Sequence, residues 1–362
     1  MIRLINRIKK IPAFFIDIWD EIVLCIKDLK ISVYRVNGKS KHGDELIIYH
    51  LGRTNPPNHF LKKFYLEKPI IEIEKYIYFW QIKGKLESIE KQGNLAFLRL
   101  HKWLAVYIGR DLINIPEMVR LGLDLNKDDA EFEKIFNYRS IKDDLRKIEK
   151  YNYTYEISRD PDNVEFFYNN MNVPFIKMRH RHYARLFPMN TVHKFCTEGI
   201  LFIKKDGKYV AGTTLQKMGT TMVTRMVGVL NGDEALLKQS VIAAVYYFLI
   251  KFSKENGYKK LDFGGTAPIL NDGILWYKSK WGMTIMRDRW DSMRFMLQVR
   301  SLNDASKKVL FDNPMIAVMN GKMGMCIFSD STIPNDKIAG TQIPARPDYF
   351  NGIEFTKIVT LN

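Results

Sequence analysis

The segment LDFGGTAPILNDGILWYKSKWG, residues 261–282, decides the fold prediction. It begins as an apolar strand that ends in Asp262 and a glycine pair, Gly264 and Gly265. Glycines after a strand allow a tight turn with positive φ, or a close approach of the backbone to a ligand. A loop follows, and then lysines alternate with large aromatic rings over residues 276–281. The segment therefore predicts a strand, a loop and then a short helix or turn that carries cations among rings.

The residues before this segment predict a sheet followed by a long helix. Residues 199–230 have the pattern of three antiparallel strands, and the Asp-Gly pair at 206–207 suits a hairpin turn with positive φ. Residues 231–257 predict a helix that starts with acidic residues, carries an apolar stripe and ends at Gly257. With the strand at 258–265 added, this order predicts an α+β fold with a mixed, mostly antiparallel sheet and flanking helices.

The chain is expected to have three parts. They are an N-terminal α/β region at 1–110, a main domain at 111–300, and a C-terminal extension with short strands at 301–362. In the first part, β-branched and aromatic residues predict strands at 45–52 and 70–84 and a strand pair at 94–109. In the main domain, residues 129–152 predict a helix, and residues 163–187 predict helix on either side of Pro174, which forces a break or kink.

The composition favours a folded protein with anionic partners. Of 362 residues, 46% are hydrophobic and 13% aromatic, which is ample for a buried core. The formal net charge is +16, and an excess of this size suits nucleic acid, phosphate-bearing cofactors or acidic membrane surfaces. A solvated basic surface without a partner is the alternative explanation of the same charge.

The N-terminal segment MIRLINRIKKIPAFFIDIWDEIVLCIKDLK is amphipathic at helical spacing. Early acidic residues argue against a signal peptide, and no apolar run reaches the ~20 residues of a membrane helix. Such a helix lies on an anionic membrane or packs on its own protein, and the sequence leaves both open. Three cysteines without metal or disulfide spacing favour a reducing cytoplasm, with the inner face of the membrane as the site of any lipid contact. No zinc pattern is present, so no metal is predicted.

Four segments of the main domain resemble the FemAB-like branch of the GNAT superfamily, which includes the peptidoglycan-bridge aminoacyltransferases. They are RSIKDDLRKIEKYNYTYEISRD, FFYNNMNVPFIKMRH, KENGYKKLDFGGT and DGILWYKSKWG, and the match covers about residues 111–300. The resemblance implies an N-acyltransferase that moves an acyl or aminoacyl group from acyl-CoA or aminoacyl-tRNA to an amine. The implied acceptor is a small-molecule or lipid-linked amine of the cell envelope or an amino sugar. Some members carry tandem copies, so the N-terminal third is a candidate for a degenerate second copy.

The loop before the long helix departs from the common GNAT pattern. GNAT enzymes usually carry a glycine-rich phosphate cradle here, whereas this chain has VLNGDEALLK with Gly232 and two carboxylates. Like charges oppose a pyrophosphate at this place, although the FemAB-like branch often lacks the cradle. The donor is therefore either coenzyme A bound in another way or an aminoacyl-tRNA.

The resemblance and the residue types together name the candidate site. Lys278, with Tyr277 beside it, is the candidate cation for the oxyanion or for a donor phosphate, although a lysine that packs its stem beside core rings would look the same. Gly264, Gly265 and Thr266 are candidates for ligand contact, and the glycines also suit a plain turn. Asp262 is expected to orient Lys278 or to cap the loop.

Two further segments complete the candidate site. Arg179, His180 and His182 lie in a basic run that suits an anionic acceptor, with His180 as a candidate general base, and a solvated basic face is the alternative. If that run is helical, residues 178, 181, 182 and 185 share one face. By resemblance alone, the donor chain lies along Arg225, Met226, Val227 and Gly228.

A second class of function fits the same charge. A non-catalytic GNAT-like module that binds RNA, tRNA included, or an anionic membrane would also need a basic surface. No signature of the common RNA-binding folds is present, which favours the enzyme.

Overall fold

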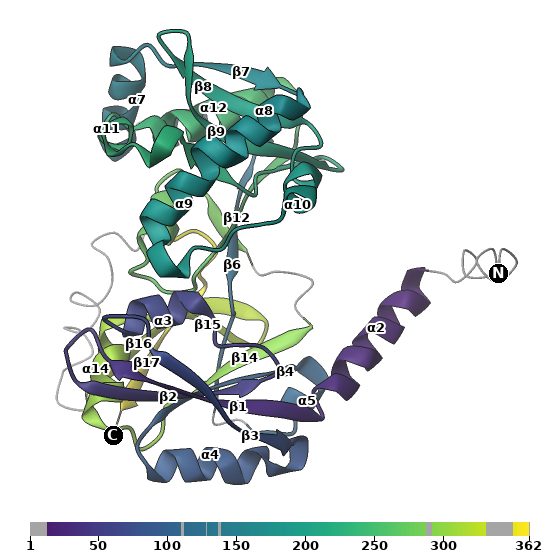
Figure 1. Ribbon diagram of the computed structural model, residues 1–362, viewed down its shortest axis with the longest axis vertical. Helices are drawn as coiled ribbons and strands as arrows, with labels where there is room; N and C mark the ends of the chain where they lie inside the picture. Colours follow the sequence, from purple (N-terminus) through teal and green to yellow (C-terminus); the bar gives the residue numbers. More distant parts are fainter. Residues whose placement is uncertain are drawn as a thin grey trace, which may run out of the picture.

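The computed structural model describes residues 13–109, 112–127, 129–136, 139–286, 292–330 and 350–361. Figure 1 shows two lobes along the long axis, each built on a sheet with helices against it. Hydrogen bonding joins most neighbouring strands in antiparallel pairs, and three pairs are parallel: β2–β4, β10–β12 and β16–β17. The predicted α+β fold with a mostly antiparallel mixed sheet is therefore confirmed.

The first lobe contains a six-stranded sheet in the order β3-β1-β2-β4-β14-β5. The strands are β3 (Ile70–Tyr78), β1 (Lys30–Lys39), β2 (Glu45–Gly52), β4 (Leu95–His101), β14 (Met293–Gln298) and β5 (Ile113–Ile115). Its helices are α2 (Ala13–Lys27), α3 (Asn58–Phe64), α4 (Ile82–Lys91), α5 (Lys102–Ala105), α14 (Asp304–Asp312) and the 3₁₀ turn η1 (Phe79–Gln81). A small sheet of β15 (Met315–Met319), β16 (Lys322–Asp330) and β17 (Phe355–Leu361) packs beside it.

Both faces of the first sheet are buried along its inner strands, whereas most side chains of the edge strand β3 are exposed. Along β4, Leu95 and Phe97 enter the core shared with α3, α14 and the small sheet, whereas Ala96 and Leu98 enter the core shared with α4. Successive side chains of a strand point to opposite faces, so a strand covered on both sides is apolar throughout. This explains the nearly unbroken apolar run of β4.

The second lobe contains the sheet β13-β6-β12-β10-β9-β8-β7, with β11 paired to β9. The strands are β6 (Val119–Asp124), β7 (Thr154–Ser158), β8 (Gly199–Lys205), β9 (Lys208–Met218), β10 (Thr221–Val223), β11 (Val227–Val229), β12 (Lys260–Thr266) and β13 (Thr284–Met286). The longer helices are α6 (Asp129–Phe136), α7 (Arg139–Lys150), α8 (Pro161–Phe166), α9 (Val173–His180), α10 (Met189–Lys194), α11 (Glu234–Lys238), α12 (Val241–Glu255) and α13 (Gly273–Ser279). Shorter turns are η2 (Phe167–Asn172), η3 (Arg181–Tyr183) and η4 (Leu230–Gly232).

The chain crosses between the two sheets twice. β5 belongs to the first sheet, and β6, which follows after residues 116–118, belongs to the second. Later in the chain β13 belongs to the second sheet, and β14 returns to the first sheet between β4 and β5. Figure 1 shows β6 and β12 running between the lobes, and these crossings place the end of β12 at the junction.

Several local predictions are confirmed. Asp206 and Gly207 have φ values of 50° and 77° in the turn that joins β8 to β9. β12 and α13 lie where the opening segment predicted them.

The predicted break at Pro174 is absent, because α8, η2 and α9 follow one another with helical backbone angles at Phe167, Asn172 and Val173. Pro174 lies at the start of α9, where a proline is tolerated, and the turn before it is π-helical.

Four further local predictions are wrong. The strand predicted at 70–84 ends at Tyr78, where η1 and then α4 begin. Residues 94–109 form one strand followed by α5, because the His101 side chain accepts from the amide of Trp103 and caps a helix. The predicted helix at 231–257 is interrupted between α11 and α12, where Ser240 is left-handed with a φ of 61°. The predicted shared face of residues 178, 181, 182 and 185 does not exist, because α9 ends at His180 and Arg181 has a φ of 47°.

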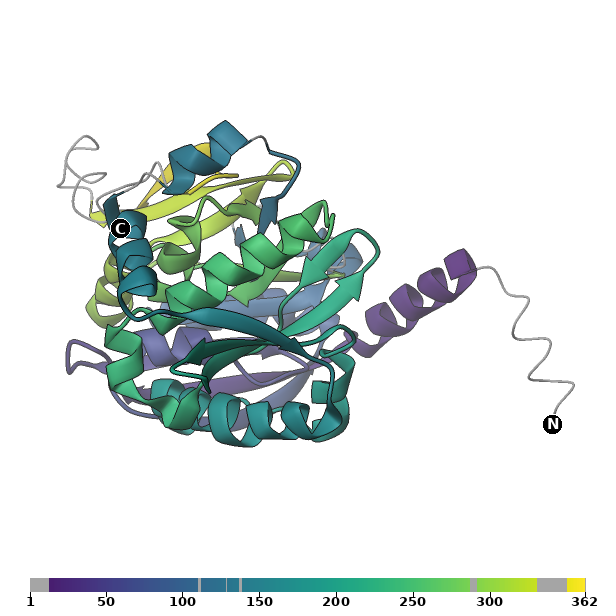
Figure 2. The same ribbon diagram turned by 90° about the horizontal axis from the view of Figure 1, so that it is seen from above.

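Helix α2 projects away from the first lobe, as both views show (Figures 1 and 2). The first part of the predicted amphipathic segment, residues 1–12, lies outside the described residues. Within the described ranges, no helix combines the length and apolarity that crossing a bilayer requires.

Candidate functional site at the junction of the lobes

The parallel strands β10 and β12 diverge at the candidate site. They pair from Thr221 with Lys260 to Val223 with Asp262, and the amide of Thr224 donates to the carbonyl of Asp262. Beyond that point β11 pairs with β9, and the end of β12 pairs with β6. All residues of both strands are described here, and no ladder pairing joins β11 to the end of β12.

A bulge in β12 marks the point of divergence. Gly264 has a φ of 73°, and the register with β6 shifts between Asp262 and Gly265. The Asp262 carboxylate accepts from the amide of Gly264 at 2.8 Å and from the guanidinium of Arg120. Asp262 thus caps the loop, which is one of its two predicted roles, whereas the Lys278 ammonium bonds to the carbonyls of Phe263 and Gly265 instead.

Lys278 lies against this bulge with its ammonium buried. Its Nζ donates to the carbonyl of Phe263 at 2.7 Å and to that of Gly265 at 3.3 Å. Burial lowers the pKa of Lys278 to about 8, while the carboxylates of Asp262 and Asp272 act in the opposite direction. Among the described residues two of its three N–H donors are therefore used by the strand end.

The aromatic residues around Lys278 belong to the hydrophobic core of the second lobe or pack against it. Tyr277 is edge-on to Tyr246 with ring centroids 5.4 Å apart, and burial raises the Tyr277 pKa well above its ordinary value. Trp281 is fully buried. Lys280 pairs with Asp144 at 2.7 Å and lies over the Tyr277 ring. The lysines of this segment are thus held in place by the second lobe rather than free on its surface.

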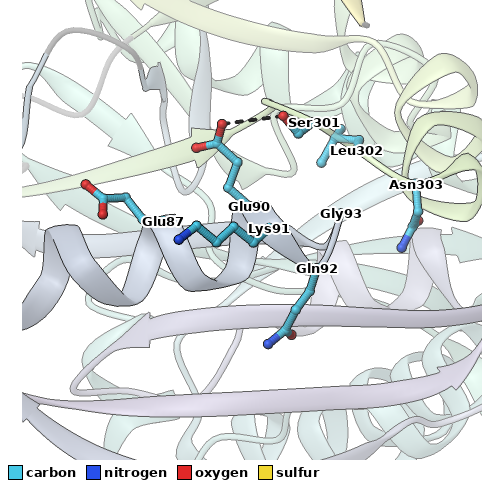
Figure 3. Close-up of a pocket in the computed structure, with 8 residues that line it drawn as sticks. All are labelled: Glu87, Glu90, Lys91, Gln92, Gly93, Ser301, Leu302 and Asn303. Atoms are coloured by element: carbon cyan, nitrogen blue, oxygen red, sulfur yellow. Dashed lines mark hydrogen bonds between the residues drawn. The ribbon is translucent and has the colours of Figure 1, made fainter.

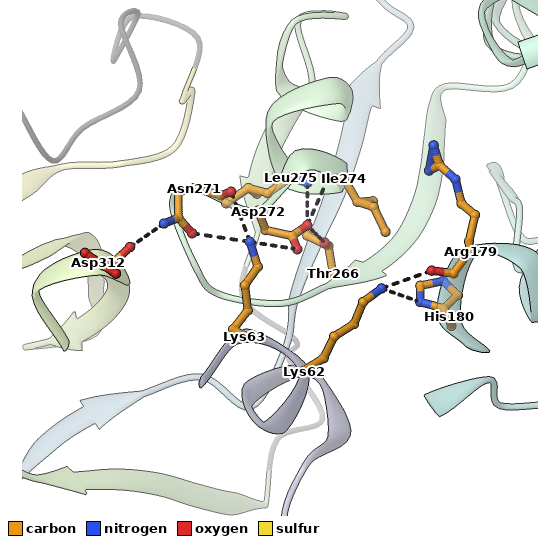
Figure 4. Close-up of polar contacts among 10 residues, drawn as sticks. All are labelled: Lys62, Lys63, Arg179, His180, Thr266, Asn271, Asp272, Ile274, Leu275 and Asp312. Carbon is orange, nitrogen blue, oxygen red and sulfur yellow. Dashed lines mark hydrogen bonds and ion pairs between the residues drawn. The ribbon is translucent and has the colours of Figure 1, made fainter. Parts of the chain in front are cut away.

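Cations of α3 and α9 and the loop before α13 meet at the junction beside this strand end (Figure 4). Lys62 of α3 contacts the end of α9, where its Nζ lies 3.2 Å from the carbonyl of Arg179 and 3.2 Å from Nδ1 of His180. Lys63 donates to the carbonyl of Asn271 at 3.1 Å and lies 3.8 Å from the carboxylate of Asp272. The first lobe therefore supplies two ammonium groups to a site whose other members come from the second lobe.

Asp272 organises the loop between β12 and α13. Its Oδ1 accepts from the amides of Ile274 at 2.9 Å and Leu275 at 3.1 Å, which is the geometry of a helix N-cap. The Thr266 hydroxyl donates to the same oxygen at 3.4 Å. The Asp272 charge also raises the pKa values of Lys62, Lys63 and Lys278 against the effect of their burial, so one carboxylate connects the junction with the strand end.

The contact between Lys62 and His180 fixes the tautomer of the imidazole. An ammonium group can only donate, so Nδ1 of His180 accepts and Nε2 carries the hydrogen. Burial, followed by the charges of Lys62 and Arg179, lowers the His180 pKa, so the ring is neutral at pH 7. In this arrangement His180 presents a donor, and a base role requires Lys62 to release Nδ1.

The other predicted residues make different contacts. His182 is exposed beyond the end of α9, where its ring lies 4.2 Å from that of Tyr183. The Arg225 side chain contacts Gln216 on β9 at 3.3 Å. Val227 gives its carbonyl to the Asn172 side chain at 2.8 Å.

The backbone of the predicted donor strand is partly engaged within the lobe. The Thr214 hydroxyl accepts from the amides of Arg225 and Met226, and the Met226 carbonyl accepts from the amide of Thr214. Gly228 is buried under η2, where an added Cβ would lie 2.6 Å from the amide nitrogen of Asn172. These residues border the divergence of the strands, and their use as a donor groove remains a prediction.

The polar face of α3 was missed by the sequence analysis. His59, Lys62 and Lys63 have the i, i+3, i+4 spacing that places side chains on one helical face. Burial lowers the His59 pKa to about 4, and the charge of Asp272 acts against this effect. A basic face on a short helix after two prolines was the available signal, but nothing local connected it with residues more than a hundred positions later.

Two other features contribute nothing to this site. A cavity of about 590 Å³ lies between the end of α4 and the start of α14 and contains none of the predicted residues (Figure 3). Burial raises the Cys196 pKa to about 12, so this thiol is not an activated nucleophile. Within the described ranges, no group of three or more metal-ligating side chains is gathered.

Comparison of the sequence with models of protein families gave no match, and comparison with curated proteins gave none. Among solved structures, FemX aligns with a TM-score of 0.37 at 12% identity, over 75% of this chain and 89% of that one. L-PGS from Bacillus licheniformis aligns with a TM-score of 0.36 at 12% identity, over 73% and 83%. A GCN5-related N-acetyltransferase from Kribbella flavida aligns with a TM-score of 0.29 at 10% identity, over 70% and 81%.

Proposed function

We propose that this protein is an N-acyltransferase that passes an acyl or aminoacyl group directly from an activated donor to an amine. The observation that carries the proposal is the buried ammonium of Lys278 at the place where β12 loses its partner β10. Strand edges without a ladder partner can receive an extended amide chain, as an added strand would. A cation at such an edge is suited to the negative charge that develops on an attacked carbonyl.

Lys278 has one N–H left for the substrate in this proposal. Two of its donors are bonded to the carbonyls of Phe263 and Gly265, which fix the direction of the third. With a pKa of about 8 the group is mostly charged at pH 7. It therefore stabilises the oxyanion from a position that is already fixed before the reaction, so no reorganisation is needed in the transition state.

The transfer needs no covalent enzyme intermediate. The amine nitrogen of the acceptor forms a bond to the acyl carbon, the thioester or ester bond of the donor breaks, and the leaving sulfur or oxygen takes up the proton that the amine gives up. Placing the two substrates together in one site supplies much of the rate. The raised pKa of Cys196 is in keeping with direct transfer.

The cations of the junction suit a charged substrate. Lys62, Lys63 and Arg179 lie where α3 meets the end of α9 and the loop before α13. Ammonium and guanidinium groups bind phosphate or carboxylate, which coenzyme A, tRNA and lipid-linked acceptors all carry. We propose that acyl-CoA or aminoacyl-tRNA is the donor and that a small-molecule or lipid-linked amine is the acceptor.

The test is transfer with both donor types in parallel. The purified protein is incubated with acyl-CoA and an amine panel, and thiol release is measured; in the second arm, labelled aminoacyl-tRNA replaces acyl-CoA. Lys278→Met, checked for folding by its thermal unfolding, is expected to lower turnover about 100-fold or more. Wild-type turnover in the folded variant would remove Lys278 from the mechanism. RNA retention with a steep salt dependence and no transfer from either donor would instead support a binding module.

A further inference from the structure

The corner of the first lobe next to α2 exposes several large apolar side chains. We call Tyr78, Trp80, Trp103, Val106 and Tyr107 the aromatic corner. Trp80 and Tyr107 are each 70% exposed and Val106 is 79% exposed. Single exposed apolar residues are ordinary, but a group of this kind marks an interaction surface.

Contacts between the segments place these residues at one corner. The amide of Phe79 donates to the carbonyl of Leu29 at 2.9 Å and ties η1 to the end of α2. The Tyr107 ring is edge-on to Phe79 with centroids 6.4 Å apart, which brings the turn after α5 to the same place. Lys102 of α5 pairs with Glu21 of α2 at 2.8 Å.

Helix α2 extends the same surface. It leaves the lobe at this corner and projects outward without covering the sheet (Figures 1 and 2). Trp19 is 64% exposed on it, and Ile26 is also exposed. Residues 21–25 of α2 are half-buried against the lobe, whereas the exposed apolar side chains of the helix are left for another partner.

Cations surround the aromatic corner. Lys27, Lys30 and Lys83 are exposed, and Lys30 Nζ lies 5.5 Å from the ring centroid of Tyr76. Two carboxylates close to this corner are paired: Glu21 with His101 and Lys102, and the buried Asp28 with Arg53. Asp20 is an exposed acid on α2. The sequence that precedes α2 adds only cations in its first ten residues, namely Arg3, Arg7, Lys9 and Lys10.

We propose that the aromatic corner and α2 together bind the surface of an anionic phospholipid bilayer. Tryptophan and tyrosine favour the interface between headgroups and acyl chains because one part of each side chain is apolar and the other polar. Lysines next to them are attracted to the negative surface of the membrane. This combination of exposed rings, a projecting amphipathic helix and exposed lysines fits an anionic lipid surface. The inference involves no reaction step and is independent of the proposed function.

The experiment is cosedimentation of the full chain with vesicles. Vesicles of equimolar phosphatidylcholine and phosphatidylglycerol are compared with vesicles of phosphatidylcholine alone. The wild-type protein is expected to sediment with the anionic vesicles and to be released by high salt, because exposed charges are screened. The double variant Trp80→Ser, Tyr107→Ser is expected to bind about tenfold or more weakly. Lys30→Glu is expected to weaken binding to the anionic vesicles as well.

Leu66→Ser is the matched control. Leu66 is exposed near the opposite end of β1, where its amide donates to the carbonyl of Lys39, so its loss is expected to leave vesicle binding unchanged. Equal binding of the wild type and the double variant would overturn the proposal, as would equal binding to both vesicle types. Analytical ultracentrifugation without lipid provides a further check. A dimer that the double variant abolishes would assign the surface to a second copy of this chain instead.

Discussion

The Lys278 ammonium donates to the main-chain carbonyl of Phe263, with 2.7 Å between Nζ and O. The bond connects helix α13 to the bulged end of β12, and a second bond at 3.3 Å reaches Gly265. A buried ammonium with only carbonyl partners is more costly to charge than a solvated one, which is why its pKa falls to about 8.

This relationship predicts a specific pH dependence of stability. The unfolded chain holds the Lys278 proton up to the ordinary pKa of 10.5, whereas the folded chain releases it near 8. Since the unfolded state binds more protons in this window, the contribution of Lys278 to the free energy of unfolding rises with pH between about 8 and 10.5. The maximum gain is about 3 kcal/mol. Denaturant unfolding of the wild type and of Lys278→Met across this window measures it, and a constant difference between the two would show that the ammonium is not desolvated.

Lys62 is expected to control the titration of His180. Its ammonium lies 3.2 Å from Nδ1, and its charge is one of the causes that lower the His180 pKa. Lys62→Met removes both the hydrogen bond and the repulsion, so the His180 pKa is expected to rise toward its ordinary value. NMR titration of the imidazole signals measures the change.

Lys63→Met is the control for this titration. Lys63 is the next residue of the same helix, but its hydrogen bonds go to Asn271. The His180 pKa is expected to stay where it is in the wild type. An equal rise in both variants would show that general loss of positive charge, rather than the contact with Nδ1, sets the pKa.

The sequence was most informative where the structure is local. The Asp206-Gly207 turn depends on two backbone conformations that those residue types favour, and both have positive φ. The strand, bulge and helix of the opening segment are likewise encoded by neighbours, with Gly264 at positive φ and Asp272 as the N-cap of α13. The mistaken strand after His101 shows the limit, because an apolar run with β-branched residues suits a strand and a buried helical turn alike.

Which residues meet at the junction could not be predicted from local sequence. Lys62 and His180 are far apart in the sequence, and they meet because the chain crosses between two sheets. No residue near Lys62 encodes that crossing. The partners of Lys278 were missed for a related reason: the bulge in β12 frees carbonyls whose direction depends on the whole sheet.

Asp272 is expected to stabilise the fold as a helix cap. Its carboxylate accepts from two amides at the start of α13, and Asp272→Ala leaves both without that partner. The expected loss is about 1 kcal/mol in the free energy of unfolding. Asp272→Asn, whose side-chain oxygen also caps, should lose much less, and chemical denaturation of the two variants makes the comparison. Equal losses would show that the charge of Asp272, rather than its capping oxygen, is what the junction requires.

Gly228 is required by close packing, whereas Gly84 is not, so alanine is expected to have opposite effects at the two positions. A Cβ at Gly228 would lie 2.6 Å from the amide nitrogen of Asn172 and 2.7 Å from the carbonyl carbon of Met171, and backbone atoms of η2 cannot move aside as a flexible side chain would. Gly228→Ala is therefore expected to cost about 3 kcal/mol, or to push η2 away from β11.

Gly84→Ala is expected to increase the free energy of unfolding, whereas Gly228→Ala is expected to lower it. Gly84 lies inside α4, and a Cβ there meets no described atom within 4 Å. Alanine restricts the unfolded chain and favours the helix, so the variant should gain about 1 kcal/mol. Both free energies are measured by chemical denaturation, with circular dichroism to confirm the folded baseline. If Gly228→Ala unfolded at the same denaturant concentration as the wild type, the contact between η2 and β11 would have to be looser than described, and the strand that borders the Lys278 site would have room for a ligand chain.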